Sequence, residues 1–418
     1  MANSSSSASH GGNRNGVPNW ETPSRVEVNR KSQEFLLWYR TSREVYSTPS
    51  DKFHKMVKVS EMSREQVLEA IEKYQKNIKN DGPNTVVDQS ASNTRIAGEK
   101  GAKRRILEDG DKVCHPREKT RKRLRRALEL LHSFCKEKVY RTLRSFFYMD
   151  VALFKDQSKT NKAINQVCIE LRCTRSSLNV FATDRGTVIG ALSFKLEGRL
   201  VNCNIEAGDD ITCKLGQIIP PFMNLVTEME VGGDVWFILF VEKYSVFLEL
   251  TLENFHNKYH CIIITGTGQA DVVSRQLTKK LMDDFKLPAF CLVDCDPSGI
   301  EISAVVKHGS VNMAYDSKNL ASPLMYWLGI WPSDLVKLNI PSEELLKKDL
   351  KKIGELIMEE FVNDDVTLKS ELDRMVEHQR KASLENLSAL GTHCLYRNYL
   401  PYKLYKTMNQ IMQGNTGA

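Results

Sequence analysis

The sequence lacks any long hydrophobic run. Its longest unbroken apolar stretch is VWFILFV (Val235–Val241), whereas a helix that spans a bilayer needs about 20 apolar residues. The opening residues, MANSSSSASHGGNRNG, are polar and low in complexity, unlike the apolar core of a signal peptide. We therefore expect no membrane partner and no secretion signal.

Cysteine pairs are lacking as well. The ten cysteines form no CxxC motif and no cluster with histidine. Cys168 and Cys173 lie five residues apart, a spacing that common zinc sites do not use. Scattered thiols without a disulfide framework fit a reducing compartment, the cytosol or the nucleus.

A nucleotide-binding loop is the third feature that the sequence lacks. The glycine-rich stretch TGTGQAD (Thr265–Asp271) has no GxxxxGK[ST] and lacks the third glycine of GxGxxG. It predicts a turn from a strand into a helix, with Asp271 near the helix start. We therefore expect no ATP site in this chain.

Positive charge is concentrated in one block. The whole chain has a net charge of +7, and residues 103–126 contain eleven Lys and Arg against four Asp and Glu. The remaining chain is therefore almost balanced. One interpretation is a solvated linker with a helix start. The other is a nuclear-import signal or a phosphate-binding arm, which the dense run RKRLRR favours.

The 418 residues suggest two or three domains. We expect residues 1–110 to be largely disordered or linker, with one helix over Ser63–Ile78. Ser63 and Gln66 form a capping box, and apolar residues follow at helical spacing.

Residues 121–205 predict helices followed by a β-hairpin. The spacing indicates a helix that ends at Leu171, a short turn, and a second helix opened by Thr174 or Ser176. A hairpin is expected around Asp184-Arg185-Gly186. A helix–turn–helix followed by a β-wing reads DNA, although many small α+β domains share this order of elements.

Residues 215–410 change to an alternation of buried strands and helices. Three apolar runs, DVWFILFVEK, YHCIIITGTG and AFCLVDCD, are separated by helical patterns such as DVVSRQLTKKLMDDF. This alternation indicates a parallel α/β sheet. The predicted fold class is therefore α/β plus α+β.

Acidic residues end two of these predicted strands. Glu242 ends the first strand, and Asp294 and Asp296 end the third. Ligands gather beyond the carboxyl ends of parallel strands, and alternate residues of an extended segment point to one side. Three carboxylates there suit Mg²⁺. For a single aspartate, a turn that caps the next helix is the simpler interpretation.

A phosphatase of the DxD type is a rival enzyme class, because its active site also ends a strand in two aspartates. That class normally continues with Gly-Thr or Thr-Val. Here Pro297, Ser298 and Gly299 follow, which speaks against it.

A tyrosine is the candidate nucleophile. LRSFFYMD places Arg144 four residues before Tyr148, where we expect a helix to end, and residues at this spacing share a helix face. A phenol has a pKa of about 10 and is a poor nucleophile at neutral pH. A neighbouring guanidinium would hold a phosphate and favour the phenolate. A tyrosine after two phenylalanines is, however, usually a core aromatic.

These residues together resemble the topoisomerase VI A-type protein and its relative, the meiotic double-strand-break protein. The resemblance runs from about Tyr140 to Leu404, in the order of the family. The matching stretches are RSFFYMDVALFKDQ, CTRSSLNV, QIIPP, FVEKYSVF, TGTGQADVVSRQL, LVDCDPSGIEI, NMAYDSKNL, YWLGIWPSDL and NYLPYKL.

The resemblance implies two domains. A winged-helix (CAP-like) domain over 121–205 would carry the nucleophile, and a Toprim domain with a C-terminal helical extension over 215–410 would carry Mg²⁺. By position, Tyr148 matches the catalytic tyrosine and Arg144 the arginine before it. The residues that match the acidic metal ligands are Glu242, Asp294 and Asp296. The residues that we expect to contact DNA are Arg175, Arg185 and Arg275.

The resemblance also implies an activity. The family cleaves double-stranded DNA by transesterification, in which the tyrosine forms a 5′-phosphotyrosyl bond and releases a 3′-hydroxyl. A homodimer makes two cuts, each tyrosine working with the partner's metal site. A separate B-type ATPase-like subunit completes a heterotetramer, which agrees with the missing ATP site. We expect action in the nucleus, either in meiotic break formation or as part of a topoisomerase.

Several positions depart from the family pattern. The altered positions near the expected site are Ser145, Tyr244, Thr267 and Ala270, with a milder change at Arg185. Two of these changes remove charged groups, while the tyrosine and the three carboxylates remain. The alternative function is therefore a catalytically weakened paralogue that serves as a DNA-binding or dimer-forming scaffold.

Overall fold

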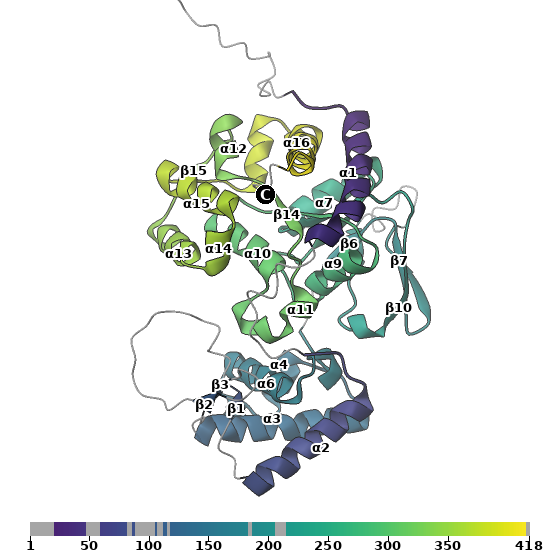
Figure 1. Cartoon of the computed structure of the whole chain (residues 1–418), viewed down its shortest axis with the longest axis vertical. Coiled ribbons are helices and arrows are strands. Elements are labelled where there is room, and N and C mark those ends of the chain that lie inside the picture. The colour runs from purple at the N-terminus through teal and green to yellow at the C-terminus, as the bar shows by residue number, and fades with distance from the viewer. Residues whose placement is uncertain are drawn as a thin grey trace, which may run out of the picture.

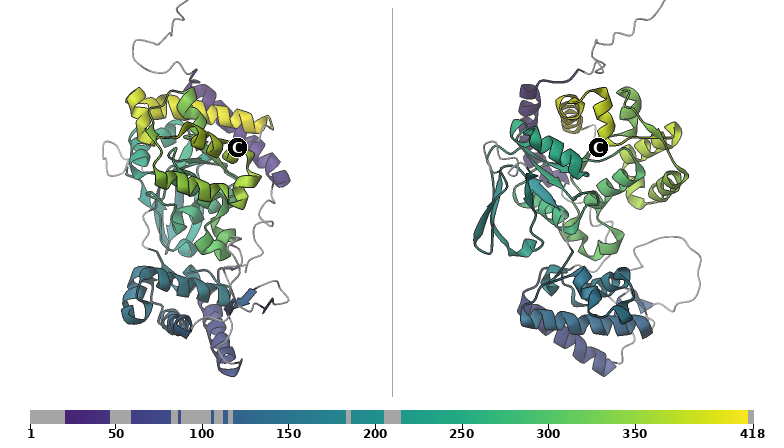
Figure 2. Two further views of the ribbon diagram at one scale, coloured as in Figure 1. Left: turned by 90° about the vertical axis from the view of Figure 1, so that its left-hand side faces the viewer. Right: turned by 180° about the vertical axis from the view of Figure 1, so that it is seen from behind.

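The structure is a computed structural model that describes residues 21–46, 59–81, 86–87, 105–106, 112–114, 118–182, 186–204 and 215–414. The described residues form two stacked lobes (Figure 1), and Figure 2 shows the same arrangement from two further sides. We call the described residues within 59–182 the first lobe, and those within 21–46 and 186–414 the second lobe. No described helix combines the length and the apolar character that crossing a membrane requires.

The first lobe is mainly helical. Its helices are α2 (Arg64–Asp81), α3 (Glu118–Glu137), α4 (Leu143–Tyr148), α5 (Val151–Phe154), α6 (Gln157–Leu171) and the 3₁₀ turn η2 (Ser176–Leu178). Its short strands are β1 (Val86–Val87), β2 (Arg105–Ile106), β3 (Lys112–Cys114), β4 (Arg141–Thr142) and β5 (Val180–Phe181). Strands β1, β3 and β2 pair antiparallel, whereas β4 and β5 pair in parallel.

The helix predicted from Ser63 is present as α2. The capping box forms as expected: Ser63 N–H donates to Gln66 Oε1 over 2.8 Å, and Gln66 N–H donates to Ser63 Oγ over 3.3 Å. These bonds satisfy donors that the first turn leaves without partners. Val67 and Ile71 are fully buried, so the predicted apolar face packs into the core of the first lobe.

The second helix predicted from Thr174 or Ser176 is only the single turn η2. Thr174 Oγ1 accepts the Ser177 N–H over 3.3 Å, a side-chain bond of the kind that starts a helical turn. Asn179 then takes the left-handed conformation, with φ of 58°, which ends the turn. The predicted hairpin around Asp184-Arg185-Gly186 does not form from its flanking strands: β5 pairs with β4, and residues 187–189 pair with strands of the second lobe. Asp184 and Arg185 themselves lie outside the described residues.

The second lobe holds most of the chain. Its strands are β6 (Thr187–Ile189), β7 (Leu192–Leu196), β8 (Arg199–Asn202), β9 (Gln217–Ile218), β10 (Val226–Val231), β11 (Phe237–Val241), β12 (Cys261–Thr265), β13 (Ala289–Leu292), β14 (Met325–Gly329), β15 (Glu343–Glu344) and β16 (Arg380–Lys381). Its longer helices are α1 (Arg25–Tyr46), α7 (Tyr244–Leu252), α9 (Val272–Asp284), α10 (Pro297–His308), α13 (Lys347–Ile357), α15 (Val366–His378) and α16 (Leu400–Met412). Its shorter helical segments are α8 (Phe255–Lys258), α11 (Ser317–Leu320), α12 (Pro332–Lys337), α14 (Glu360–Asp364), η4 (Met223–Leu225), η5 (Val311–Asp316), η6 (Leu384–Leu390) and η7 (Leu395–Tyr399).

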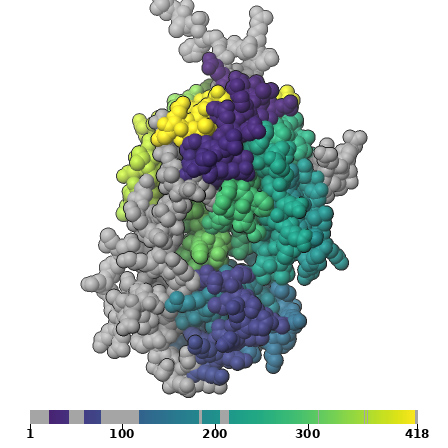
Figure 3. Space-filling view, turned by 45° about the vertical axis from the view of Figure 1, so that its right-hand side comes forward, coloured from purple at the N-terminus to yellow at the C-terminus, as the bar shows by residue number. Residues whose placement is uncertain are grey.

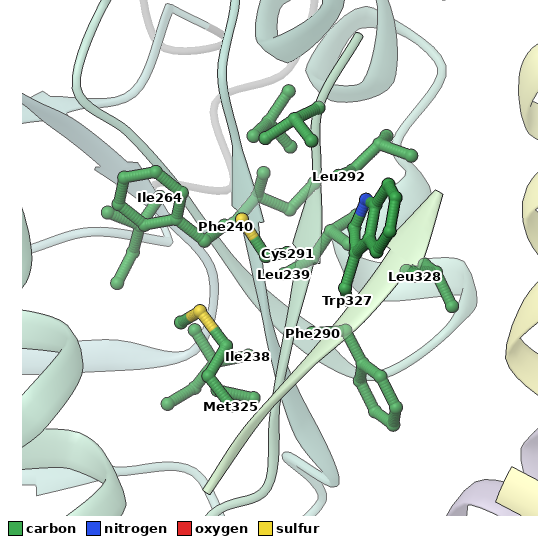
Figure 4. Close-up of a cluster of buried hydrophobic side chains, with 14 of the residues drawn as sticks. Ile238, Leu239, Phe240, Ile264, Phe290, Cys291, Leu292, Met325, Trp327 and Leu328 are labelled. Carbon is green, nitrogen blue, oxygen red and sulfur yellow. The ribbon is translucent and has the colours of Figure 1, made fainter. Parts of the chain in front are cut away.

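A six-stranded sheet organises this lobe, in the order β14-β13-β11-β12-β6-β9. The four strands β14, β13, β11 and β12 run in parallel, as the alternating pattern predicts. Every residue of β11, β12 and β13 is buried, and Figure 4 shows their side chains packed with those of β14. Burying one large apolar side chain such as Ile, Leu or Phe stabilises the folded state by about 1.5–3 kcal/mol. This sheet is therefore the main core of the described residues.

Strands β6, β7 and β8 fall within residues 121–205, which we expected to belong to the first domain. The structure pairs β6 antiparallel with β12 in the central sheet, and β7 joins β8 and β10 in a separate sheet of the second lobe. All three residues of β6 are buried, because pairing with β12 in the apolar central sheet removes them from water. The chain therefore passes from the first lobe to the second between residues 182 and 186.

Helix α1 was not predicted from the sequence. Its buried side chains, Val28, Phe35, Leu36 and Tyr39, follow a helical spacing that the polar Ser32 interrupts. Ser24 and Glu27 form a capping box at its start, in which Glu27 N–H donates to Ser24 Oγ over 3.3 Å. Figure 3 shows α1 in dark purple against the yellow C-terminal helix α16. Helix α1 therefore packs onto the core of the second lobe.

Candidate active site

Three carboxylates lie at the carboxyl ends of two neighbouring strands, and we call this group the acidic edge (Glu242, Asp294 and Asp296). Strands β11 and β13 are paired in parallel, with Val241 beside Leu292. Glu242 N–H donates to Leu292 O over 3.0 Å, so the first carboxylate directly follows a paired position. Because β11 and β13 are paired in parallel, Glu242 and Asp294 leave the sheet at the same edge.

Backbone hydrogen bonds fix each carboxylate. Asp294 N–H donates to Glu242 Oε2 over 2.9 Å, and Leu384 N–H donates to Asp294 Oδ1 over 2.9 Å. Asp296 Oδ1 accepts the N–H groups of Ser298 and Gly299 over 2.8 and 2.7 Å, so Asp296 does cap α10. A carboxylate oxygen has more than one lone pair, and a cap therefore leaves Asp296 able to take part in further coordination.

Gly299 is required by the closeness of α10 to the acidic edge. A Cβ atom at this position would lie 2.4 Å from Asp294 O, a distance at which the two atoms would overlap. Glycine is the one residue that carries no Cβ. The short motif Asp-Pro-Ser-Gly thus lets the helix start directly beside the second strand end.

The acidic edge concentrates negative charge in a buried place. Glu242 and Asp294 are 8% and 7% exposed. Burial, and next the charge of Asp294, raise the pKa of Glu242 to about 7. Burial also raises the pKa of Asp294, although a hydrogen bond from Lys243 opposes this shift. A bound cation would relieve both the burial of charge and the mutual repulsion.

The chemistry of these donors fits Mg²⁺, which prefers carboxylate oxygens and keeps several waters. The side chains, however, are not arranged around one point as they would be around a bound ion. Within the described ranges, no three His, Cys, Asp or Glu side chains are gathered closely enough to hold a metal ion. Lys243 Nζ instead lies 2.8 Å from Asp294 Oδ2, so an ammonium group balances the charge of this carboxylate.

Tyr148 lies on helix α4 of the first lobe, and we call α4 with its cap Thr142 the tyrosine end. Thr142 Oγ1 accepts the Ser145 N–H over 2.9 Å and caps the helix. Phe146 is fully buried and packs edge-on against Phe134, with ring centroids 5.7 Å apart. Tyr148 is the last residue of α4 and is 60% exposed. Its side chain therefore faces solvent and is not the core aromatic that its neighbours suggest.

Arg144 is also exposed and lies four residues before Tyr148 on the same short helix. Helix α5 follows at once, capped by Asp150, whose Oδ1 accepts the Leu153 N–H over 3.1 Å. Asp150 pairs with Arg126 over 3.4 Å. The backbone around Tyr148 is therefore held in place by the core of the first lobe and by the ion pair between Asp150 and Arg126 of α3.

Arg175 lies at the junction of the two lobes. Its guanidinium donates to Asn165 Oδ1, with Nε at 3.0 Å. The same oxygen accepts the hydroxyl of Tyr315 over 3.1 Å, and Asn165 Nδ2 donates to Asn312 O over 2.8 Å. Asn312 and Tyr315 belong to η5 of the second lobe. In this arrangement Arg175 stabilises the lobe junction and is only half-buried.

Arg275 is enclosed at the start of α9. It is 3% exposed, and its Nε donates to Asp271 O over 3.3 Å. Burial lowers the pKa of this guanidinium to about 10. A side chain so enclosed does not reach DNA in this arrangement of the chain. Arg185, the third expected DNA contact, lies outside the described residues.

The positions that depart from the family pattern lie around both parts of the site. Thr267 has a φ of 56°, a left-handed conformation that is unusual for a β-branched residue. Its hydroxyl is buried with no hydrogen-bond partner in the part of the chain that the structure describes. Ala270 is buried, whereas Tyr244 is 38% exposed at the start of α7. Ser145 lies in the first turn of α4.

The structure brings the three carboxylates to one edge and places Tyr148 and Arg144 in the other lobe. Two further residues were not singled out from the sequence: Lys243 contacts Asp294 of the acidic edge, and Glu385 contacts Lys243. Lys243 directly follows Glu242, and this adjacency was the available signal. Glu385 lies far along the chain, on η6, and no local pattern marks it.

Family models match both lobes. Residues 119–180, which include Tyr148, match the model for Type IIB DNA topoisomerase. Residues 237–404, which include the acidic edge, match the model for the Toprim domain that the A-type protein of topoisomerase 6 shares with Spo11. The parallel sheet of the second lobe fits this Toprim match.

Curated relatives give the same result. The A-type protein of DNA topoisomerase 6 from Arabidopsis thaliana is 40% identical over 282 residues, which cover 67% of this chain and 64% of the relative. Meiotic recombination protein SPO11 of Homo sapiens is 36% identical, with 66% and 69% covered. SPO11-1 of Arabidopsis thaliana is 33% identical, with 68% and 78% covered. The chain therefore belongs to the family of topoisomerase 6 A-type proteins and Spo11, although it matches less than two thirds of the length of the topoisomerase 6 relatives.

Proposed function

We propose that this chain cleaves double-stranded DNA by transesterification at Tyr148, in the presence of Mg²⁺. One observation carries the proposal. A solvent-exposed tyrosine in the lobe that matches Type IIB topoisomerase accompanies buried carboxylates at the strand ends of the lobe that matches Toprim. Relatives named for topoisomerase 6 and for meiotic recombination support the same reaction class.

In the reaction, Tyr148 Oη forms a bond to the phosphorus of a backbone phosphate, and the bond from that phosphorus to the 3′-oxygen breaks. The phenolic proton is balanced by the proton that the released 3′-hydroxyl gains. One phosphodiester replaces another, so the step needs no external energy source. Arg144, on the same helix face, would hold the phosphate and favour the phenolate.

Glu242, Asp294 and Asp296 would hold Mg²⁺. The bound ion supplies positive charge that stabilises the phosphoryl oxygens as charge develops on them. The chain's own contribution is to fix these carboxylates by backbone hydrogen bonds and to keep them largely out of water. Preorganised groups of this kind need little rearrangement when substrate binds.

Further parts of the proposal concern assembly. We propose that the helices of residues 121–205 act as a winged-helix DNA-binding region, which the helical character of the first lobe supports. Because Tyr148 and the acidic edge lie in different lobes, a homodimer in which each tyrosine meets the partner's acidic edge suits the geometry. We further propose a B-type ATPase-like partner in a heterotetramer and action in the nucleus.

The test is a covalent adduct. The purified chain, with a B-type partner from the same source, is incubated with plasmid DNA and Mg²⁺ and then denatured. We expect DNA linked to protein through its 5′ ends, and no adduct from Tyr148→Phe or without Mg²⁺. Tyr140→Phe is the matched control, because Tyr140 is also an exposed tyrosine of the first lobe, 39% exposed.

Three outcomes would redirect the proposal. DNA binding and partner capture without any adduct would favour the scaffold function of a weakened paralogue. An adduct that persists in Tyr148→Phe would show that another residue is the nucleophile. Hydrolysis of small phosphomonoesters, lost in Asp294→Asn, would instead support the phosphatase interpretation.

A further inference from the structure

A lysine occupies the acidic edge. Lys243 Nζ lies 2.8 Å from Asp294 Oδ2 and 2.6 Å from Glu385 Oε2. It also donates to Ser383 Oγ over 2.7 Å. One ammonium group thus joins a carboxylate of the acidic edge to a second carboxylate that belongs to the C-terminal part of the chain. We call Lys243, Ser383 and Glu385 the lysine clamp.

The lysine clamp is built into the fold. Leu384 N–H donates to Asp294 Oδ1 over 2.9 Å, and Cys295 and Ala382 exchange backbone hydrogen bonds of 2.8 and 3.0 Å. These bonds place the segment after β16 directly on the strand end. Ser245 Oγ donates to Glu385 Oε1 over 2.9 Å, so Glu385 is held from two sides.

The two carboxylates differ in their surroundings. The side chain of Asp294 is 9% exposed, whereas that of Glu385 is 47% exposed and that of Lys243 is 28% exposed. A buried carboxylate needs a positive partner, while a half-exposed carboxylate is also stabilised by water. Glu385 is therefore a place where the ammonium group can stay without Asp294.

A divalent cation and Lys243 compete for the same oxygen. Asp294 Oδ1 already accepts a backbone N–H, and Oδ2 carries the ammonium group. A cation bound at the acidic edge with Asp294 Oδ2 as ligand would approach the oxygen that Lys243 now contacts.

We propose that Lys243 shields Asp294 until a divalent cation binds, and that Glu385 then holds the displaced ammonium group. Both act as positioning residues for the acidic edge. The inference rests on the proposed function, because it requires that Asp294 is a ligand of the cation. It adds that the affinity for the cation is set by a lysine and by a carboxylate from the C-terminal part of the chain.

The test measures Mn²⁺ binding to the full chain without DNA, by calorimetry and by electron paramagnetic resonance, with Asp294→Asn to identify the site. We expect Lys243→Gln to bind Mn²⁺ about tenfold more tightly, the effect of removing one charge-assisted hydrogen bond. We expect Glu385→Gln to bind Mn²⁺ more weakly by about the same factor. The displaced ammonium group would then have no carboxylate to receive it.

The double variant separates this inference from a simple effect of nearby charge. If Glu385 acts through Lys243, Lys243→Gln with Glu385→Gln binds Mn²⁺ as tightly as Lys243→Gln alone. If Glu385 acts only as a negative charge, the double variant binds more weakly than Lys243→Gln, and the inference is overturned. Lys307→Gln is the matched control, because Lys307 forms a partly buried ion pair with Asp365 at 3.0 Å, away from the acidic edge.

A second measurement guards against variants that fold poorly. Without metal, Lys243→Gln and Lys243→Met should melt at a lower temperature than the wild type, because Asp294 loses its positive partner. With Mn²⁺, both should gain more in melting temperature than the wild type does. Wild-type binding that depends on Asp294 but is unchanged in the Lys243 variants overturns this inference alone. A wild type that binds no Mn²⁺ overturns the proposed function as well.

Discussion

The tyrosine end and the acidic edge are built in opposite ways. Tyr148 is 60% exposed on a six-residue helix, whereas Glu242 and Asp294 are 8% and 7% exposed and are bonded to the backbone. A nucleophile must reach a large substrate, so exposure suits the role that we propose for Tyr148. Carboxylates that repel one another must be held by their surroundings, so burial and hydrogen bonds suit them.

The two regions also differ in how far along the chain their supports lie. Helix α4 is capped by Thr142 and packs on α6 and α5, all within the same lobe. The acidic edge joins two strand ends with Leu384, which is 90 residues from Asp294. The tyrosine end is therefore a local structure, and the acidic edge depends on the complete second lobe.

The largest expected effect on stability comes from two residues of α4, one buried and one exposed. Phe146 is fully buried between Phe134 and Phe154, with centroid distances of 5.7 and 5.8 Å. Phe146→Ala should therefore lower the free energy of unfolding by about 3–5 kcal/mol. Tyr148→Ala, two residues away, should change it by less than about 0.5 kcal/mol. Urea denaturation of both variants checks this, and a similar loss in both would show that Tyr148 supports the fold.

Lowering the pH should destabilise the second lobe through a buried histidine. His256 of α8 is 6% exposed, and burial lowers its pKa to about 4. The folded pKa lies below the ordinary value of about 6.5, so folding favours the neutral ring. The stabilisation is complete above pH 6.5 and is lost as pH falls towards 4, by about 2 kcal/mol at pH 5.

Urea denaturation between pH 7.5 and 5 measures this loss. His256→Gln should show a flatter dependence of unfolding free energy on pH over this window. His378→Gln, at an exposed position, is the matched control and should follow the wild type. An unchanged slope in His256→Gln would mean that other groups cause the acid sensitivity of the second lobe.

A glycine pair tests how tightly the acidic edge is packed. Gly299→Ala places a Cβ atom 2.4 Å from Asp294 O, so we expect a loss of about 1–3 kcal/mol and weaker Mn²⁺ binding. Gly354→Ala, in α13 with no atom within 4 Å of the added Cβ, should gain about 0.5–1 kcal/mol. Thermal unfolding of both variants checks the difference. Equal effects would show that the backbone near Asp294 can move freely.

Parts of both regions could be predicted from the sequence. The buried runs that end at Glu242 and Asp294 predicted parallel strands, because only strands buried on both faces are apolar throughout. The capping box at Ser63 predicted the start of α2. In each case neighbouring residues alone determine the local structure.

Other parts could not be predicted because they depend on distant contacts. The buried Ser32 interrupts the apolar spacing of α1, which is stable because it packs on α16. The predicted helix after Thr174 ends after one turn, where Asn179 takes the left-handed conformation and Val180 pairs with Arg141 of β4. The lysine clamp joins Lys243 to Glu385 through a fold that brings them together, and no spacing in the sequence records it.

The central claim is that Tyr148 of one chain works with the acidic edge of another, and a mixing experiment tests it most directly. Tyr148→Phe and Asp294→Asn chains of different length are mixed, exchanged into mixed dimers, and incubated with DNA, Mg²⁺ and the B-type partner. We predict that neither variant alone forms an adduct and that the mixture forms one on the Asp294→Asn chain. A mixture that forms confirmed mixed dimers but no adduct on that chain would contradict the claim.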